Sequence, residues 1–182
     1  MSAVLKRPSE HEKRRKEIFK DSRPFVRKYL ETDLGFLWAA YKNGSFPIPQ
    51  GLTQEDFLPA MVVQFGAFNL LWIIEDDSSQ FKSGRGQVGL VGIKTDGWTF
   101  EPVIYFFKWA GETSRKRSLI ALCHMMRFQK DVGVFLVKAT ESEKSMFDPL
   151  KDYGVLYYRG VVPYGSPSGN LYLYSINGRK GV

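Results

Sequence analysis

Three consecutive cations, Arg115-Lys116-Arg117, lie among the hydroxyl residues Thr113, Ser114 and Ser118, directly before an apolar segment. Thr113 or Ser114 can cap a helix that runs to about residue 130, and a capped helix start presents unpaired N–H groups and a positive dipole end. These residue types predict an anion-binding site. The alternative is a solvated turn before a core helix, because charge runs are common there. Exposed cations oppose the dipole by about 0.3 to 1 kcal/mol each, so an anion should compensate them.

Two short apolar runs, Pro102–Phe107 and Val132–Val137, flank this turn and helix. Both are rich in β-branched and aromatic residues and do not alternate with polar ones, which is typical of strands covered on both faces of a partly parallel sheet. The segment therefore predicts a βαβ unit with a right-handed crossover and a helix packed on the sheet.

The rest of the chain supplies helices and antiparallel strands around this central unit. In chain order we expect a helix at 25–41, a helix at 53–66, strands at 69–75 and 87–94, a short helix at 141–147 ended by Pro149, and strands at 155–162 and 171–176. The last two strands should form a hairpin on the edge of the sheet. The fold class is α/β (α+β), with a mixed sheet, two N-terminal helices and a C-terminal β-hairpin.

The composition fits one globular domain at 25–182 preceded by a basic arm at 1–24. Of the 182 residues, 43% are hydrophobic and 25% are charged, which is ordinary for a soluble protein. Cys123 is the only cysteine and lies in an apolar helix, so we expect an inert core thiol, no disulfide and no metal site. No apolar run approaches the roughly 20 residues of a membrane span, and no signal peptide is recognisable. We expect the protein in a host cytoplasm or a virion.

The positive charge is concentrated at the start of the chain. Residues 1–28 hold ten Lys or Arg and four Asp or Glu, a net +6 out of +7 for the whole chain. Such an arm can contact DNA, RNA or an acidic protein surface, and a solubilising extension is the alternative. The candidate contact residues are Lys13, Arg14, Arg15, Lys16 and Lys20.

The order of elements over residues 25–178 resembles that of the GNAT acyltransferase superfamily. In that family the turn after the fourth strand holds the pyrophosphate of acetyl-CoA at the mouth of a cleft where two parallel strands diverge. The resemblance implies that the pantetheine arm lies along Phe107, Lys108 and Trp109. The candidate phosphate-binding residues that it implies are Ser114, Arg115, Lys116, Arg117 and Ser118. Glu101, near the start of the fourth strand, is the candidate general base, and a surface residue is the alternative.

Two departures from the GNAT pattern bear on function. Residues 114–118 contain no glycine, although glycines normally let the family's turn approach phosphate closely. Leu150 stands four residues before Gly154, where the family commonly has an acid tyrosine. Together with the basic arm, these absences resemble the degenerate GNAT-like proteins of tailed-phage virions.

Three hypotheses remain open at this stage. The first is a structural, assembly or DNA-ejection protein with protein partners in a virion and possibly DNA on its arm. The second is an active acetyl-CoA-dependent N-acetyltransferase without a metal. The third is a nucleic-acid-associated protein that acts through the arm alone.

Deleting residues 1–24 tests the arm. If the arm contacts DNA, the full chain binds duplex DNA with an affinity that falls steeply with salt, and the truncated chain loses that binding, because phosphate contacts release counterions. Fluorescence anisotropy at about 50 and 200 mM salt measures both. Unchanged, salt-insensitive binding after truncation would refute a role for the arm.

Overall fold

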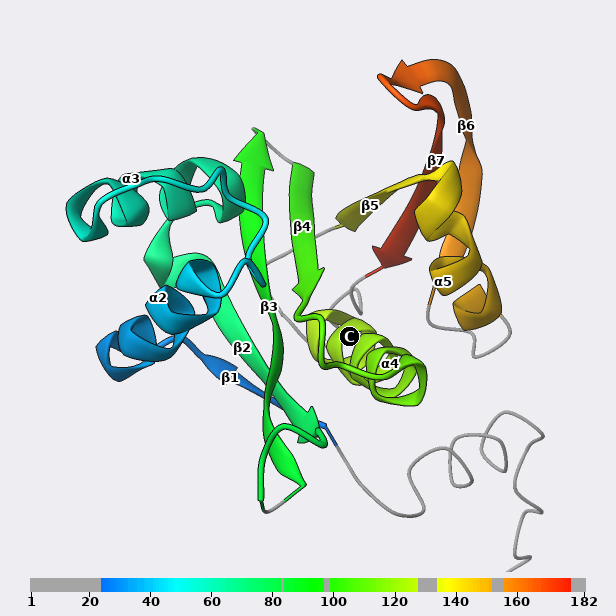
Figure 1. Cartoon of the computed structure of the whole chain (residues 1–182). Helices are drawn as coiled ribbons and strands as arrows, with labels where there is room; N and C mark the ends of the chain where they lie inside the picture. Colours follow the sequence, from blue (N-terminus) through cyan, green and yellow to red (C-terminus); the bar gives the residue numbers. More distant parts are fainter. Residues whose placement is uncertain (1–23, 83, 97–98, 128–133, 152–155, 178–182) are drawn as a thin grey trace, which may run out of the picture.

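A computed structural model describes residues 24–82, 84–96, 99–127, 134–151 and 156–177. The arm residues Lys13, Arg14, Arg15, Lys16 and Lys20 lie outside the described residues. One seven-stranded mixed sheet runs through the molecule in the order β1-β2-β3-β4-β5-β7-β6 (Figure 1). The strands are β1 (Phe25–Lys28), β2 (Leu71–Asp77), β3 (Arg85–Asp96), β4 (Thr99–Phe106), β5 (Val134–Thr140), β6 (Tyr157–Ser166) and β7 (Gly169–Asn177).

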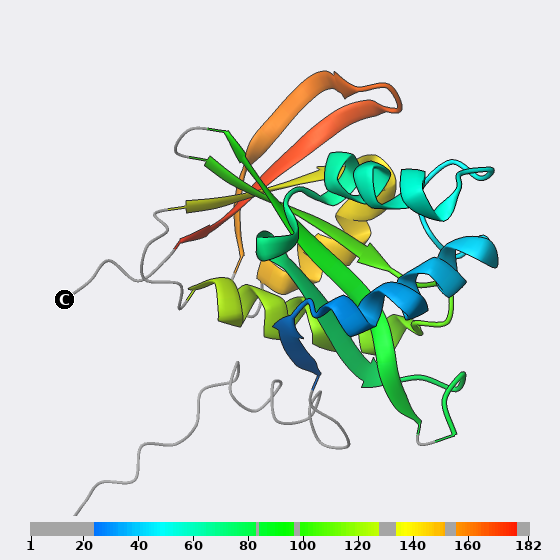
Figure 2. The same cartoon turned by 90° about the vertical axis from the view of Figure 1, so that its left-hand side faces the viewer.

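Helices cover both faces of this sheet (Figures 1 and 2). On one face, α2 (Leu34–Lys42) and α3 (Gln54–Phe65) pack over β2, β3 and β4 through a core rich in aromatic rings. On the other face, α4 (Glu112–Arg127) and α5 (Glu141–Lys151) pack over β3, β5 and β7. Two 3-10 turns, η1 (Glu31–Asp33) and η2 (Phe68–Leu70), precede α2 and β2. None of the helices that the structure describes has the length and apolar character needed to cross a bilayer.

The central βαβ unit and the terminal hairpin are confirmed. Strands β4 and β5 are parallel and are joined through α4, and β2 and β3 pair antiparallel as expected. Thr53 caps α3, and its hydroxyl accepts a hydrogen bond from the N–H of Asp56. The hairpin joins the sheet through β7, which lies between β5 and β6. The mixed α/β class therefore holds.

The segment after Pro24 corrects one prediction, because Phe25–Lys28 is a strand and not the start of a helix. The spacing of its apolar residues fits a helix as well as a strand, and pairing with β2 decides between them. Phe25 lies opposite Glu75, and Lys28 lies opposite Trp72. Only Leu34–Lys42 is helical, so a single long N-terminal helix is wrong.

Two smaller boundaries also differ from expectation. Helix α5 continues through Pro149 to Lys151, which shows that Pro149 does not end it. The final hairpin turns at Pro167-Ser168, so most of the expected loop belongs to its strands.

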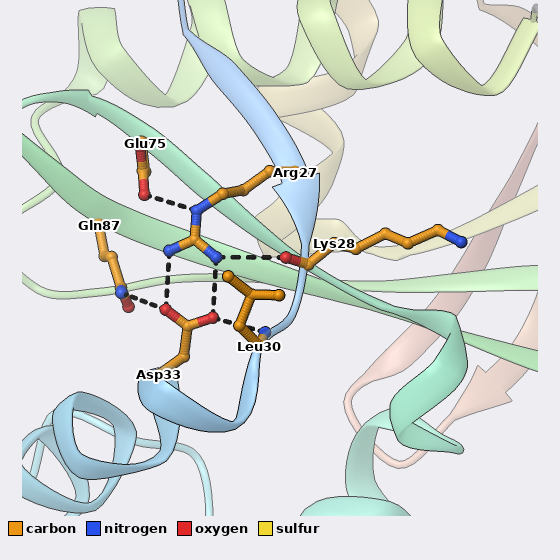
Figure 3. Close-up of polar contacts among 6 residues, drawn as sticks. All are labelled: Arg27, Lys28, Leu30, Asp33, Glu75 and Gln87. Carbon is orange, nitrogen blue, oxygen red and sulfur yellow. Dashed lines mark hydrogen bonds and ion pairs between the residues drawn. The ribbon is translucent and has the colours of Figure 1, made fainter.

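A buried ion-pair network holds β1 against its neighbours (Figure 3). The Arg27 guanidinium donates to both oxygens of Asp33 at 2.7 and 2.8 Å, and its Nε donates to Glu75 at 2.8 Å. Asp33, only 4% exposed, also accepts from the Leu30 N–H at 2.8 Å and from the Gln87 amide at 2.9 Å. The Asp33 carboxylate therefore joins β1, η1 and β3, and Arg27 adds β2 through Glu75, which fixes where α2 begins.

Replacing Asp33 by Asn is expected to lower the free energy of unfolding at pH 7 by about 2 kcal/mol. Burial alone would raise the pKa of the Asp33 carboxyl, but hydrogen bonds from Arg27 and the Leu30 N–H outweigh it and hold that pKa below its usual value. Its contribution is therefore present above the ordinary carboxyl pKa of about 3.9 and is lost as pH falls through the lower folded value.

Urea unfolding at pH 7, 5 and 3 measures this effect, with the exposed Glu31→Gln as the matched control. The difference between wild type and the Asp33 variant should shrink towards the lowest pH. An Asp33 variant as stable as the Glu31 variant at pH 7 would contradict the prediction.

Candidate functional site

The parallel strands β4 and β5 separate soon after they meet. Among the described residues one position pairs, Phe100 opposite Phe135, and beyond it the two strands run apart (Figure 1). The opening contains a cavity of about 180 Å³, which we call the wedge cavity. Its walls come from the end of β4, the first turn of α4 and the first half of α5. The lining residues are Ile104, Tyr105, Phe106, Arg115, Glu143, Met146 and Phe147.

The first turn of α4 opens at this cavity. The Arg115 N–H donates to the Gly111 carbonyl at 2.9 Å, so the N–H groups of residues 112–114 precede the first hydrogen bond of the helix. The Arg115 side chain donates from Nε to the Ala110 carbonyl at 2.8 Å and lines the wedge cavity. Arg115 therefore brings a positive group to the space between β4 and β5, whereas Gly111 and Thr113 line a second hollow beside β2.

The other polar side chains of the turn face β2. Ser114 Oγ donates to Asp76 Oδ2 at 2.9 Å, and Arg117 Nε donates to the same oxygen at 3.1 Å. Arg117 also pairs with Asp77 at 3.3 Å. Asp76 is completely buried and Arg117 is 7% exposed. The anion expected to compensate the cations is thus supplied, at least for Arg117, by the chain itself.

Phe107 and Trp109 lie away from the wedge cavity. Phe107 is fully buried in the core under α2 and α3, and Trp109 stacks on it with ring centroids 4.6 Å apart. The Trp109 indole N–H donates to the Gln87 carbonyl at 2.8 Å. These two side chains continue the aromatic core, and neither lines the cavity in which a pantetheine arm was expected.

The remaining predicted residues are spread around the turn. Lys108 is exposed, Lys116 is half-buried, and Ser118 is fully buried in α4. Trp109, Ser114 and Arg117 instead line a second, open hollow of about 450 Å³ beside the β2–β3 connection. Of the eight predicted cofactor residues, Arg115 alone lines the wedge cavity.

Glu101 lies near the closed end of the strands, next to the paired Phe100. Its carboxylate forms an ion pair with Lys138 of β5, and Glu101 is not part of the wedge cavity. This placement agrees with the alternative of a surface residue on the strand. Its role as a base remains an untested prediction.

Two polar residues of the cavity were missed by the sequence reasoning. Glu143 accepts from both the N–H and the hydroxyl of Thr140, at 2.9 and 2.8 Å, which is a capping box at the start of α5. The spacing Thr140-x-x-Glu143 could have identified it. Tyr105 donates its hydroxyl to the Ser45 carbonyl at 2.8 Å, and burial raises the pKa of that hydroxyl. Tyr105 could not be identified from the sequence, because its partner carbonyl lies in the loop after α2. The position of that loop is known only from the fold.

Other chemistry finds little support in the described part of the chain. Burial raises the pKa of the Cys123 thiol to about 12, so it is a core thiol and not a nucleophile. No group of three His, Cys, Asp or Glu residues among those described could hold a metal ion. Leu150 is fully buried in α5 where a GNAT acid tyrosine was expected. Tyr153 and Gly154 lie outside the described residues.

Solved structures with a similar fold are acetyltransferases. A spermidine N-acetyltransferase from Vibrio cholerae, solved with CoA and spermine, matches with a TM-score of 0.58 at 12% identity, over 87% of this chain and 97% of the other. A GNAT-family acetyltransferase from Streptococcus pneumoniae matches with a TM-score of 0.57 at 13% identity, over 86% and 99%. The chain has a GNAT fold. At these identities the similarity establishes the fold and leaves the activity open.

A further match is a putative acetyltransferase from Sphaerobacter thermophilus, with a TM-score of 0.53 at 15% identity over 85% of this chain and 93% of the other. The sequence matches no protein-family model and no curated protein.

The site fits acetyl-CoA only in part. The wedge cavity suits the narrow pantetheine arm, and Arg115 suits one phosphate. A side chain added at Gly111 would meet nothing within 4 Å, so the turn is open at this residue. The carboxylate of Glu112 in the first turn of α4 opposes a phosphate. Ser114 and Arg117 are already bound to Asp76. The binding groups that remain are Arg115 and the N–H groups of the turn.

Replacing Asp76 by Ala is expected to lower the free energy of unfolding by about 3 to 5 kcal/mol, because Arg117 would remain buried without its main partner. The matched control is Asp77→Ala, which removes a neighbouring carboxylate that is 48% exposed and should cost less than about 1 kcal/mol. Urea unfolding monitored by tryptophan fluorescence measures both. Equal effects of the two substitutions would contradict the assigned role of Asp76.

Proposed function

We propose that this GNAT-fold chain does not transfer acetyl groups and acts as a binding or assembly protein, in a tailed-phage particle or in DNA ejection. The observation that carries the proposal is the engagement of Ser114 and Arg117 by the buried Asp76. A phosphate at this helix start would have to compete with a carboxylate that is already desolvated and hydrogen-bonded. The polar side chains of the turn therefore stabilise the packing of α4 on β2 and are not available to a ligand.

The groups for proton transfer are also poorly placed. Leu150 offers no acid in α5, and Glu101 is paired with Lys138 at the closed end of the strands. Glu143 lines the wedge cavity, but its carboxylate accepts two hydrogen bonds from Thr140, which hold it at the start of α5. These placements support the proposal that the chain functions through its shape and surfaces and not through acetyl transfer.

The basic arm belongs to the same proposal. Its charge suits contact with DNA phosphates or an acidic partner in a particle, whereas the remainder of the chain is nearly neutral. If the arm acts alone, the chain is a nucleic-acid-associated protein. Its GNAT domain then needs no partner.

An active acyl-CoA-dependent N-acyltransferase is the second candidate, and the wedge cavity with Arg115 is the observation in its favour. In that case Arg115 and the N–H groups of the α4 turn hold the cofactor. An amine substrate then attacks the thioester directly, with orientation supplying most of the rate. A strong base is not required if the amine arrives neutral.

Calorimetric titration with acetyl-CoA separates the two candidates. The full chain should show no saturable heat up to roughly millimolar ligand, whereas the Vibrio cholerae spermidine N-acetyltransferase serves as a positive control. Micromolar binding that weakens at least about tenfold in Arg115→Ala would refute the proposal and favour the acyltransferase. The control is Lys138→Ala, which removes a cation outside the cavity. Arg117 is avoided because its removal disturbs the buried pair.

A further inference from the structure

The excess positive charge of the folded domain is concentrated around two connections, one between β2 and β3 and one between β4 and α4. With the end of β2 and the start of α4, they hold six Lys or Arg and three Asp or Glu. The other residues from 24 onwards hold twelve of each kind. We call this region the basic end. Its cations are Lys82, Arg85, Lys108, Arg115, Lys116 and Arg117, and its acids are Asp76, Asp77 and Glu112.

The two connections lie side by side, because residues of both line the second hollow. The Phe36 ring of α2 contacts both of them. Its centroid lies 6.2 Å from that of Phe81 and 5.9 Å from that of Trp109. Phe81 directly precedes Lys82, and Trp109 directly follows Lys108. These packed rings therefore fix the backbone from which the two lysines project.

Most of the excess charge of the basic end faces solvent. Asp76 has no solvent exposure and is bound by Arg117. Asp77 is exposed and also pairs with Arg117, and Glu112 is exposed at the start of α4. The exposed cations are Lys82, Arg85 and Lys108. The potential outside this end is therefore positive, although the domain as a whole is nearly neutral.

The basic arm joins the domain at the same end. Strand β1 begins at Phe25, which lies opposite Glu75, one residue before Asp76 in β2. The start of β1 and the end of β2 therefore lie together (Figure 1). Residues 1–23, which precede β1, hold eight Lys or Arg and four Asp or Glu. The arm is thus attached where the domain carries its own positive charge.

The surface of the basic end suits a phosphate backbone better than it suits a protein. Besides the charged groups, its exposed side chains carry hydroxyls and an amide, from Ser79, Gln80 and Thr113. Such side chains are common donors to the phosphate oxygens of DNA. A stable protein contact is built around an apolar core, and no large apolar side chain is exposed in the described part of these two connections.

We propose that the arm and the basic end form one interface for the phosphate backbone of duplex DNA, to which the folded domain contributes Lys82, Arg85 and Lys108. This inference rests on the nucleic-acid role proposed for the arm and extends that role to the GNAT domain. Duplex DNA carries one negative charge per roughly 1.7 Å of its axis, so cations on separate loops can each meet a phosphate. Binding through phosphates has little sequence preference and weakens as salt releases the contacts.

Fluorescence anisotropy of the full chain with a short labelled duplex of mixed sequence tests the proposal, between about 50 and 200 mM salt. Lys82→Ala and Lys108→Ala should each reduce the slope of log affinity against log salt by about 0.9, because each removes one phosphate contact. The double variant should reduce the slope by about 1.8. Lys82→Arg and Lys108→Arg keep the charge and should keep the wild-type slope.

The matched control is Lys94→Ala. Lys94 is also exposed and lies on β3, about 30 Å along the strand from Arg85 at roughly 3.3 Å per residue. Its substitution removes the same charge far from the basic end and should leave the slope unchanged.

Three results would overturn the proposal. The first is a slope that Lys82→Ala and Lys108→Ala leave intact, since the arm would then bind alone. The second is an equal effect of Lys94→Ala, since only net charge would matter. The third is a full chain that does not bind the duplex at about 50 mM salt, including one that binds polyglutamate only. Each result leaves the acetyl-CoA titration unaffected, so failure of this inference is distinct from failure of the proposed function.

Discussion

The position of α4 depends on one buried carboxylate. Asp76, next to the end of β2, has no solvent exposure, and its carboxylate accepts hydrogen bonds from Ser114 and Arg117 of α4. A desolvated charge without such partners would cost several kcal/mol, so the strand and the helix must meet in this orientation. The same contact places Arg115, which lies on a different side of the helix, at the opening between β4 and β5.

This arrangement lets the GNAT fold form without a ligand at the first turn of α4. Strands β4 and β5 diverge because they stop pairing after Phe100 and Phe135. The packing of α4 and α5 on the sheet keeps them apart. A phosphate can approach the turn closely only where the residues are small and the hydrogen-bond donors are not already bound to other groups. Here the side chains of Ser114 and Arg117 are directed to the internal carboxylate of Asp76, so this contact stabilises the fold whether or not a ligand binds.

The sequence predicted the central strands, α4, the hairpin and the GNAT fold, because each rests on a local pattern: short β-branched runs, an apolar helix and a turn between them. The predicted cap is wrong, because α4 already begins at Glu112, before Thr113 and Ser114. The prediction also failed at Phe25–Lys28, where the apolar spacing is compatible with both periods and the pairing of this segment with β2 decides the outcome. The hydrophobic pattern carries no information about that pairing, which exists only once β2 and β3 are in place.

The candidate site was harder to predict than the fold for the same reason. The run Arg115-Lys116-Arg117 looks uniform in sequence, but a helix turns about 100° per residue, so consecutive cations must point in different directions. Arg115 lines the wedge cavity, and Arg117 is buried against Asp76, 41 positions earlier in the chain. A cluster of charges along the sequence is therefore not a cluster in space, and an anion-binding role must be assigned to single residues after the helix has been oriented.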